Sequence, residues 1–180
     1  MPALEDLFHH RWSVPTLALL AGERGARLVR LSRALGASPG ACRTTLDALI
    51  GMGLVVRNPG YGHPLRPEYI LTPAGEALTG PASTFERAAE RLGRPEIGRR
   101  KWVMPALHAI GEGPERYTDV RARLPGVTDR ALSGALAHLE AASLVTRRVV
   151  TDRPVRTLYA PSGAGRSLQE PLRELAAACA

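Results

Sequence analysis

The sequence predicts a mainly helical α+β protein that consists of two similar halves, each with a small β-hairpin. Three observations support this prediction. Residues recur at a constant offset, apolar residues recur at helical spacing in several segments, and short β-branched runs flank Gly- and Pro-rich turns. A chain of 180 residues is long enough for two small domains, each with a modest core.

The repeat is marked by the only two tryptophans, Trp12 and Trp102, which are 90 residues apart. The same offset relates further pairs along both halves: Pro15 and Pro105, Leu17 and Leu107, Leu46 and Leu136, Leu49 and Leu139, Tyr69 and Tyr159, Gly75 and Gly165, Leu78 and Leu168. So many matches at one spacing rarely arise by chance. We therefore expect a first domain at 1–80, a helical linker at 81–94, and a second domain with a C-terminal helix at 95–180.

In the first half, apolar spacing predicts helices at 14–21 and 27–35. A third helix is expected at 38–51, because Ser38 is a favoured N-cap residue and Pro39 is favoured at the first helical position. The inward stripe of this third helix consists of four residues at helical spacing: Cys42, Leu46, Leu49 and Ile50.

Segments 54–57 and 68–71 predict two strands, and the Gly- and Pro-rich stretch between them predicts a hairpin with a long tip. Thr72 and Pro73 then begin a helix that is expected to reach Leu78.

The second half predicts the same elements in the same order. They are a helix at 118–124, a Thr128-capped helix at 128–141, and strands at 145–150 and 156–159. Two more amphipathic helices are expected, one within the linker, which Pro81 opens, and one at 170–178, with Pro171 in its first turn.

A helix, a short turn, a capped helix and a two-stranded hairpin, in that order, are typical of the winged helix–turn–helix fold. In this fold the capped recognition helix enters the major groove of DNA with its N-terminal turns at base edges, while the hairpin, or wing, contacts the backbone or the minor groove. The predicted fold is therefore mainly α with small β-hairpin wings, as winged helix–turn–helix domains in tandem.

Each half resembles the HxlR-type winged-helix transcription regulators, relatives of the MarR group. The resemblance rests on the early tryptophan of each half, the helix-to-wing steps at 53–57 and 143–147, the element at 117–120, and the second-wing-strand segment 69–75. It implies a DNA-binding transcription regulator, and we expect a repressor. Family members are usually single domains that homodimerise, whereas this chain carries two.

The bulk composition agrees with a nucleic-acid partner. The formal net charge is +7 and the pI is about 10.4, which favours a polyanion. The histidines and two cysteines show no metal-ligand spacing, and no nucleophile elbow, phosphate loop or paired-carboxylate pattern occurs, so we expect neither an enzyme nor a cofactor. The N-terminus does not read as a signal peptide and the longest apolar run is too short to span a bilayer, so we expect a cytoplasmic protein without membrane contact.

We expect double-stranded DNA to be contacted by the two recognition helices and by the wings. The helix candidates are Ser38, Arg43, Thr44, Thr128, Arg130 and Ser133. The wing candidates are Arg57, Arg66, Arg147, Arg148, Arg153 and Arg156. Neither recognition helix is rich in base-reading side chains, so phosphate contacts are expected to contribute much of the affinity.

Alternatives stay open at this point. The duplicated scaffold also fits a protein that binds small molecules, as a drug-sequestering or ligand-sensing protein, and a regulator with a small-molecule effector would combine both roles. Non-specific DNA protection or repair is a third interpretation. The two halves could form a pseudo-dimer within one chain, or two chains could form a homodimer.

Overall fold

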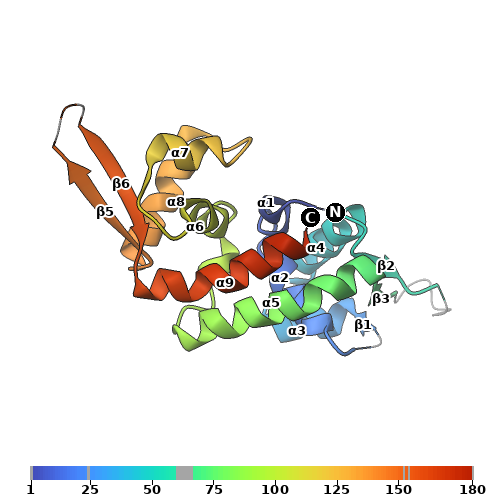
Figure 1. Ribbon diagram of the computed structural model, residues 1–180. Helices are drawn as coiled ribbons and strands as arrows, with labels where there is room; N and C mark the ends of the chain where they lie inside the picture. The colour runs from blue at the N-terminus through green and yellow to red at the C-terminus, as the bar shows by residue number, and fades with distance from the viewer. Residues whose placement is uncertain (1, 24, 60–66, 152, 154, 180) are drawn as a thin grey trace.

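The two halves of the molecule share one order of helices and strands (Figure 1). This computed structural model describes residues 2–23, 25–59, 67–151, 153 and 155–179. The first half consists of α2 (Ser13–Leu20), β1 (Ala26–Arg27), α3 (Leu28–Leu35), α4 (Pro39–Gly51), β2 (Val55–Arg57), β3 (Glu68–Leu71) and α5 (Pro73–Arg91). The second half consists of α6 (Val103–Ile110), β4 (Glu115–Arg116), α7 (Tyr117–Ala122), α8 (Asp129–Ala141), β5 (Val145–Val150), β6 (Arg156–Pro161) and α9 (Gly163–Ala178). The short helix α1 (Leu4–Leu7) precedes the first half, and the 3-10 turn η1 (Ile97–Arg99) precedes the second.

Each half contains a small antiparallel sheet, which confirms the predicted α+β class with hairpin wings. The strand orders are β1-β3-β2 and β4-β6-β5, with Val55 opposite Leu71 and Val145 opposite Pro161. The outer strands β1 and β4 were not predicted. Each has only two residues, which is too short to show the alternation by which a strand is recognised.

The long helices α5 and α9 differ from the prediction. Two short helices were expected on either side of Pro81, and a helix at 170–178 was expected to hold Pro171 in its first turn, but each proline lies inside a longer continuous helix. A proline within a helix removes one hydrogen bond and strains the preceding turn. Packing offsets this loss, because buried apolar residues continue on one face across each proline: Leu78, Ala82 and Phe85 in α5, and Leu168, Leu172 and Leu175 in α9.

The step from wing to long helix has the same geometry in both halves. An added Cβ would lie 2.0 Å from the Leu54 carbonyl oxygen at Gly75, and 2.0 Å from the Leu144 carbonyl oxygen at Gly165. Only glycine allows the helix to approach the strand this closely. The N-cap hydroxyls strengthen the step, since Thr72 Oγ1 donates to the Gly53 carbonyl at 2.7 Å and accepts from the Gly75 N–H at 3.1 Å.

The second half forms the equivalent bonds. Ser162 Oγ donates to the Ser143 carbonyl at 2.7 Å and accepts from the Gly165 N–H at 3.1 Å. The residues before the wings differ, because Gly53 has a φ of 72° whereas Ser143 adopts a left-handed φ of 54° with a side chain present.

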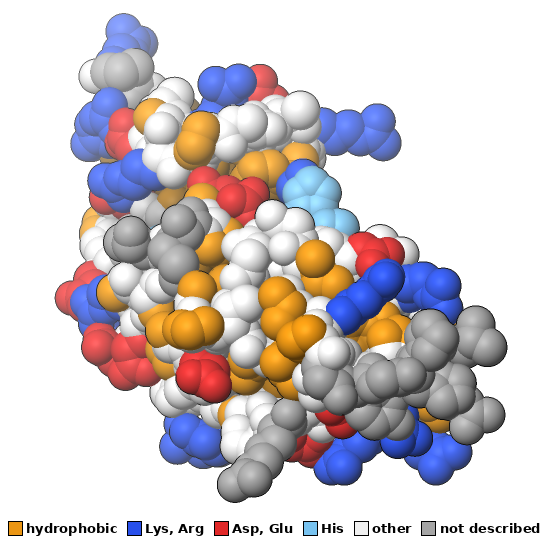
Figure 2. Space-filling view, turned by 90° about the vertical axis from the view of Figure 1, so that its right-hand side faces the viewer, with side chains coloured by type: hydrophobic (Ala, Val, Ile, Leu, Met, Phe, Trp, Pro, Cys, Tyr) orange, Lys and Arg blue, Asp and Glu red, His pale blue; other side chains and the backbone are white. Residues whose placement is uncertain are grey.

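The surface seen in Figure 2 mixes charged and apolar side chains, with Lys and Arg gathered at the top and the lower right. No helix in the described part of the chain is both long and apolar enough to cross a membrane.

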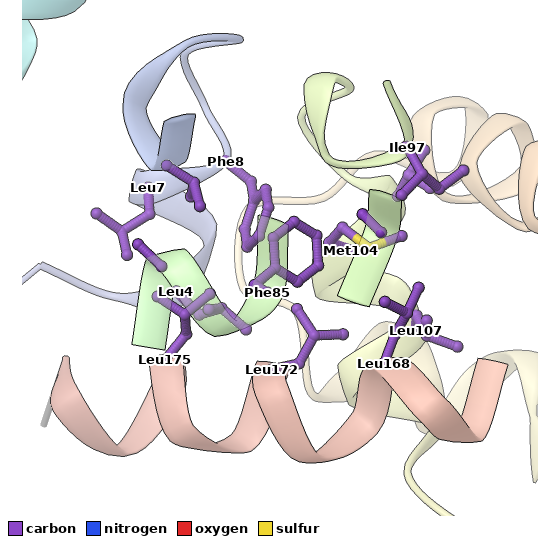
Figure 3. Packing of buried hydrophobic residues seen from close by; sticks show 14 of the residues in the cluster. Leu4, Leu7, Phe8, Phe85, Ile97, Met104, Leu107, Leu168, Leu172 and Leu175 are labelled. Atoms are coloured by element: carbon purple, nitrogen blue, oxygen red, sulfur yellow. The ribbon is translucent and has the colours of Figure 1, made fainter. Parts of the chain in front are cut away.

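A single hydrophobic core joins the two halves. The long helices α5 and α9 pack against each other, and α5 also packs against α2. Near this contact the rings of Phe8 and Phe85 meet edge to face, with centroids 5.4 Å apart and an interplanar angle of 76°. Figure 3 shows both rings within the cluster, above Leu172 of α9. The two halves therefore share apolar packing and are not linked by a tether alone.

Candidate nucleic-acid interface

Both predicted recognition helices begin with a capped N-terminus. Ser38 Oγ accepts the Ala41 N–H at 3.2 Å at the start of α4, and Thr128 Oγ1 accepts the Ala131 N–H at 3.2 Å at the start of α8. The helices end at Gly51 and Ala141, so the predicted spans are confirmed. Both cap residues are exposed, which leaves their hydroxyl protons available to an acceptor such as a phosphate.

The outward face of α4 carries Arg43, Thr44 and Asp47, and all three are exposed. The opposite face is anchored by fully buried residues: Cys42, Leu46 and Leu49. Thr44 Oγ1 donates to the Gly40 carbonyl at 3.1 Å, so only its lone pairs remain for DNA. Arg43 is therefore the side chain of this face that is best suited to read a base edge, because its guanidinium can form two parallel hydrogen bonds.

The outward face of α8 carries Arg130 and Ser133, both exposed. Asp129 lies beside them, but its carboxylate is neutralised, since Arg121 Nε lies 2.6 Å from Oδ1. The Tyr117 hydroxyl donates to the same Oδ1 and lies equally close to the Asp129 carbonyl oxygen, at 3.1 Å in both cases. This cluster reduces the repulsion that Asp129 would exert on a DNA backbone, and it links α7 to α8.

Sequence reasoning missed the roles of Tyr117 and Arg121. Their contact with Asp129 joins two helices across a turn, and no local spacing reveals such a contact. The only available signal was the presence of an acidic residue in the first turn of a helix expected to face a polyanion.

The predicted wing arginines lie on different strands and differ in their exposure. Arg57 is exposed on β2, and Arg147 and Arg148 are exposed on β5. Because neighbouring residues of a strand point to opposite faces, Arg147 and Arg148 do not serve the same surface. Arg153 is exposed near the hairpin tip and Arg156 is half-buried at the start of β6. Arg66 lies outside the described residues.

The second wing is the more extended of the two in the described chain. The strands β5 and β6 pair over six positions, and the hairpin projects away from the helices at the upper left of Figure 1. It also exposes Val149 and Val155. A projecting ribbon with arginine and apolar side chains has the shape and chemistry to lie along a DNA groove.

Comparison with known proteins agrees with this geometry. Residues 97–179 match the family model described as HxlR-like helix-turn-helix. YvaP of Bacillus subtilis, which is named as an uncharacterized HTH-type transcriptional regulator, is 31% identical over 91 residues, which cover 51% of this chain and 79% of that protein. The HTH-type transcriptional regulator YodB of the same organism is 28% identical over 81 residues, which cover 45% of this chain and 71% of that protein.

Two solved structures are also similar. A putative MarR-family transcriptional regulator from Porphyromonas gingivalis W83 has a TM-score of 0.44 and 22% identity, over 46% of this chain and 80% of that chain. Diamide-treated YodB from B. subtilis has a TM-score of 0.40 and 27% identity, over 51% of this chain and 85% of that chain.

The winged-helix arrangement, the family match and the relatives found by sequence define a DNA-binding transcription regulator of the helix–turn–helix class. The chain belongs to the HxlR-like helix-turn-helix family. The names of these relatives favour regulation over the interpretation as a drug-sequestering protein.

Proposed function

We propose that this protein represses transcription by binding one double-stranded DNA site with both halves of a single chain. The observation that carries the proposal is that two capped helices with exposed polar faces, α4 and α8, occur in a molecule whose halves share one apolar core. Such a pseudo-dimer would supply the two recognition helices that helix–turn–helix homodimers place about one DNA turn, roughly 34 Å, apart.

The two half-sites are expected to differ. At the repeat offset, Arg43 corresponds to Ser133, and Arg130 corresponds to Gly40. The first recognition helix therefore presents its arginine in its second turn, whereas the second helix presents it in the first turn. Because arginine pairs preferentially with guanine in the major groove, the guanines of the two half-sites should lie at different distances from the centre of an imperfect palindrome.

The wings supply the second component of affinity. Arg57, Arg147, Arg148 and Arg153 are exposed, and arginines at such positions contact phosphates without reading sequence. We therefore expect base discrimination from the helices and a large part of the binding free energy from the wings.

The proposal is tested by selecting bound duplexes from a random library at moderate salt, followed by footprinting and native mass spectrometry. The expected result is one protected site with two unequal half-sites and one chain per duplex. Arg43→Ala should relax sequence preference in one half-site and Arg130→Ala in the other, whereas the matched control Arg87→Ala, on α5, should leave both preferences intact. Failure to enrich any duplex would overturn DNA recognition, and two chains per site would overturn the single-chain mode.

A further inference from the structure

We infer that a cleft between the two halves binds a small organic anion and that its occupancy alters DNA binding. The regulatory part of this inference rests on the proposed function, whereas the binding part does not. The cleft has a volume of about 580 Å³ and is formed by Arg11, the connecting segment 93–100 and the C-terminal end of α8. This volume lies within the range of small-molecule sites.

The charge of the lining favours an anion. Four arginines line the cleft, Arg11, Arg94, Arg99 and Arg100, but only one carboxylate, that of Glu96. Glu96 is shared, since its Oε2 lies 2.9 Å from Arg11 Nη2 and its Oε1 lies 3.4 Å from Arg99 Nη1. Arg94 and Arg100 have no ion pair within the described chain. A bound carboxylate or phosphate would reduce the mutual repulsion of these cations and form charge-assisted hydrogen bonds with them.

One of these arginines is held in place before any ligand arrives. The Arg99 side chain is only 15% exposed, and its guanidinium lies 4.1 Å above the centre of the Trp12 ring. Within the described chain its Nε is buried without a hydrogen-bond partner, and its ion pair with Glu96 engages Nη1 alone. A preordered cation loses little conformational freedom when an anion binds.

The remaining lining indicates that the anion has an apolar body. Pro95 and Ala141 contribute exposed apolar surface to the cleft, and His138 borders it. Burial and the neighbouring Arg100 lower the pKa of His138, which weakens its contribution to the positive charge of the cleft. An organic carboxylate or phosphate satisfies both parts of this lining, whereas an inorganic ion would satisfy only the arginines.

The position of the cleft distinguishes it from the surface for DNA. His138 lies ten residues beyond Thr128 along α8, a rise of about 15 Å from the turn expected at base edges. The walls come from the first half, the connecting segment and the second recognition helix. A ligand that contacts all three walls would restrain α8 relative to the first half, and therefore the spacing of the two recognition helices.

The binding part is tested by thermal unfolding and calorimetric titration with benzoate and phenyl phosphate at constant ionic strength, with neutral benzamide as the uncharged analogue. We expect a saturable rise in Tm of a few degrees with at least one of the anions and none with benzamide. The double variant Arg94→Gln/Arg100→Gln should weaken anion binding at least tenfold. The matched control Arg87→Gln/Arg166→Gln removes the same charge elsewhere and should bind as the wild type does.

Absence of a saturable response to both anions would overturn the site, as would an equal loss of binding in the control. The regulatory part is tested by measuring the affinity for the selected duplex with and without saturating anion. A change of at least fivefold is expected, and a change below twofold would overturn regulation by this cleft. If the Arg94/Arg100 variant instead loses DNA affinity in the absence of anion, the cleft contacts phosphates of DNA and the inference is wrong. Failure to bind any duplex would contradict the proposed function without affecting the titration.

Discussion

Phe8 and Gly98 meet at the junction of the two halves, although they stand 90 residues apart at corresponding places of the repeat. A Cβ on Gly98 would lie 3.3 Å from Phe8 Cε1 and 2.8 Å from Phe85 Cε1. The segment before α2 and the helix α5 thus supply the two aromatic rings, whereas the places that correspond to them at the repeat offset hold Gly98 and Leu175. The junction is therefore asymmetric, and neither half could replace the other in it.

Gly98→Ala is expected to destabilise the protein by about 1–3 kcal/mol, the usual range for overpacking a well-filled core. The Phe85 ring cannot swing away freely, because it is buried against Phe8. Urea unfolding measures the effect. Gly134→Ala is the matched control, since a Cβ on Gly134, inside α8, meets no atom within 4 Å and should raise stability slightly. Equal stability of both variants would contradict the packing described.

Gly75→Ala and Gly165→Ala should each be more damaging than Gly98→Ala. The new methyl group would meet a backbone carbonyl oxygen, and backbone cannot rotate away as a side chain can. We expect a loss of more than about 3 kcal/mol, or no folded protein, in both variants. Circular dichroism and the midpoint of urea unfolding measure this loss. Gly163→Ala is the control, because a Cβ there meets nothing within 4 Å, and it should unfold at a midpoint close to that of the wild type.

Ser143→Gly should stabilise the protein by roughly 0.5–1 kcal/mol. Ser143 holds a left-handed φ of 54°, which costs a residue with a side chain about 1 kcal/mol or more, and glycine relieves this cost but loses more chain entropy on folding. The reciprocal change Gly53→Ser should destabilise by a similar amount, since Gly53 has a φ of 72°. We expect a higher urea midpoint for Ser143→Gly and a lower one for Gly53→Ser, with unchanged m-values. This result would verify that both positions hold a left-handed backbone conformation. The same sign in both would refute it.

Glu86 should make stability depend on pH. Burial raises the pKa of this carboxyl to about 7, with smaller contributions from Glu90 and Glu96, although Arg99 opposes the shift. The folded protein therefore holds this proton more tightly than the unfolded chain, where glutamate titrates near 4.5. The stability linked to this proton is full below about pH 4.5 and is lost as the pH rises through 7.

Glu86→Gln cannot ionise, so its Tm should exceed that of the wild type at pH 8 and approach it at pH 5. Thermal unfolding at a series of pH values tests this expectation. Glu174→Gln removes the same charge from an exposed position on α9 and should retain the pH profile of the wild type. A constant difference between Glu86→Gln and wild type from pH 5 to 8 would show that Glu86 is not linked to folding in this way.

The arginines of the second wing should determine the salt dependence of DNA binding. Each phosphate contact contributes about 0.9 to the slope of log affinity against log salt. Because the two side chains point to opposite faces of the hairpin, we expect one of them to contact a phosphate, so Arg147→Gln/Arg148→Gln should lower this slope by about 1 and should weaken binding to all duplexes alike. Fluorescence anisotropy at several salt concentrations measures the slope of log affinity against log salt. Arg87→Gln should keep the wild-type slope, and a changed base preference with an unchanged slope would contradict a phosphate role.

Features that depend on local chemistry were predictable from sequence. The spans of α4 and α8 followed from the N-cap residues Ser38 and Thr128 and from one apolar stripe each. Features that depend on tertiary packing were not. Pro81 signals a helix end locally, and only the buried face of α5 explains why the helix continues. The arginine-lined cleft likewise joins segments that no spacing relates, since Arg11 reaches Glu96 across 85 positions of sequence.

The contact between α5 and α9 has a consequence for the amount of protein that a cell needs. Two separate chains must find each other before they can act as a dimer, so the assembled fraction falls when few copies are present. Here the encounter is intramolecular and the halves are assembled at any copy number. If the single-chain mode proposed above holds, occupancy of an unsaturated operator follows gene dosage in direct proportion, and a single newly made chain suffices to read its site.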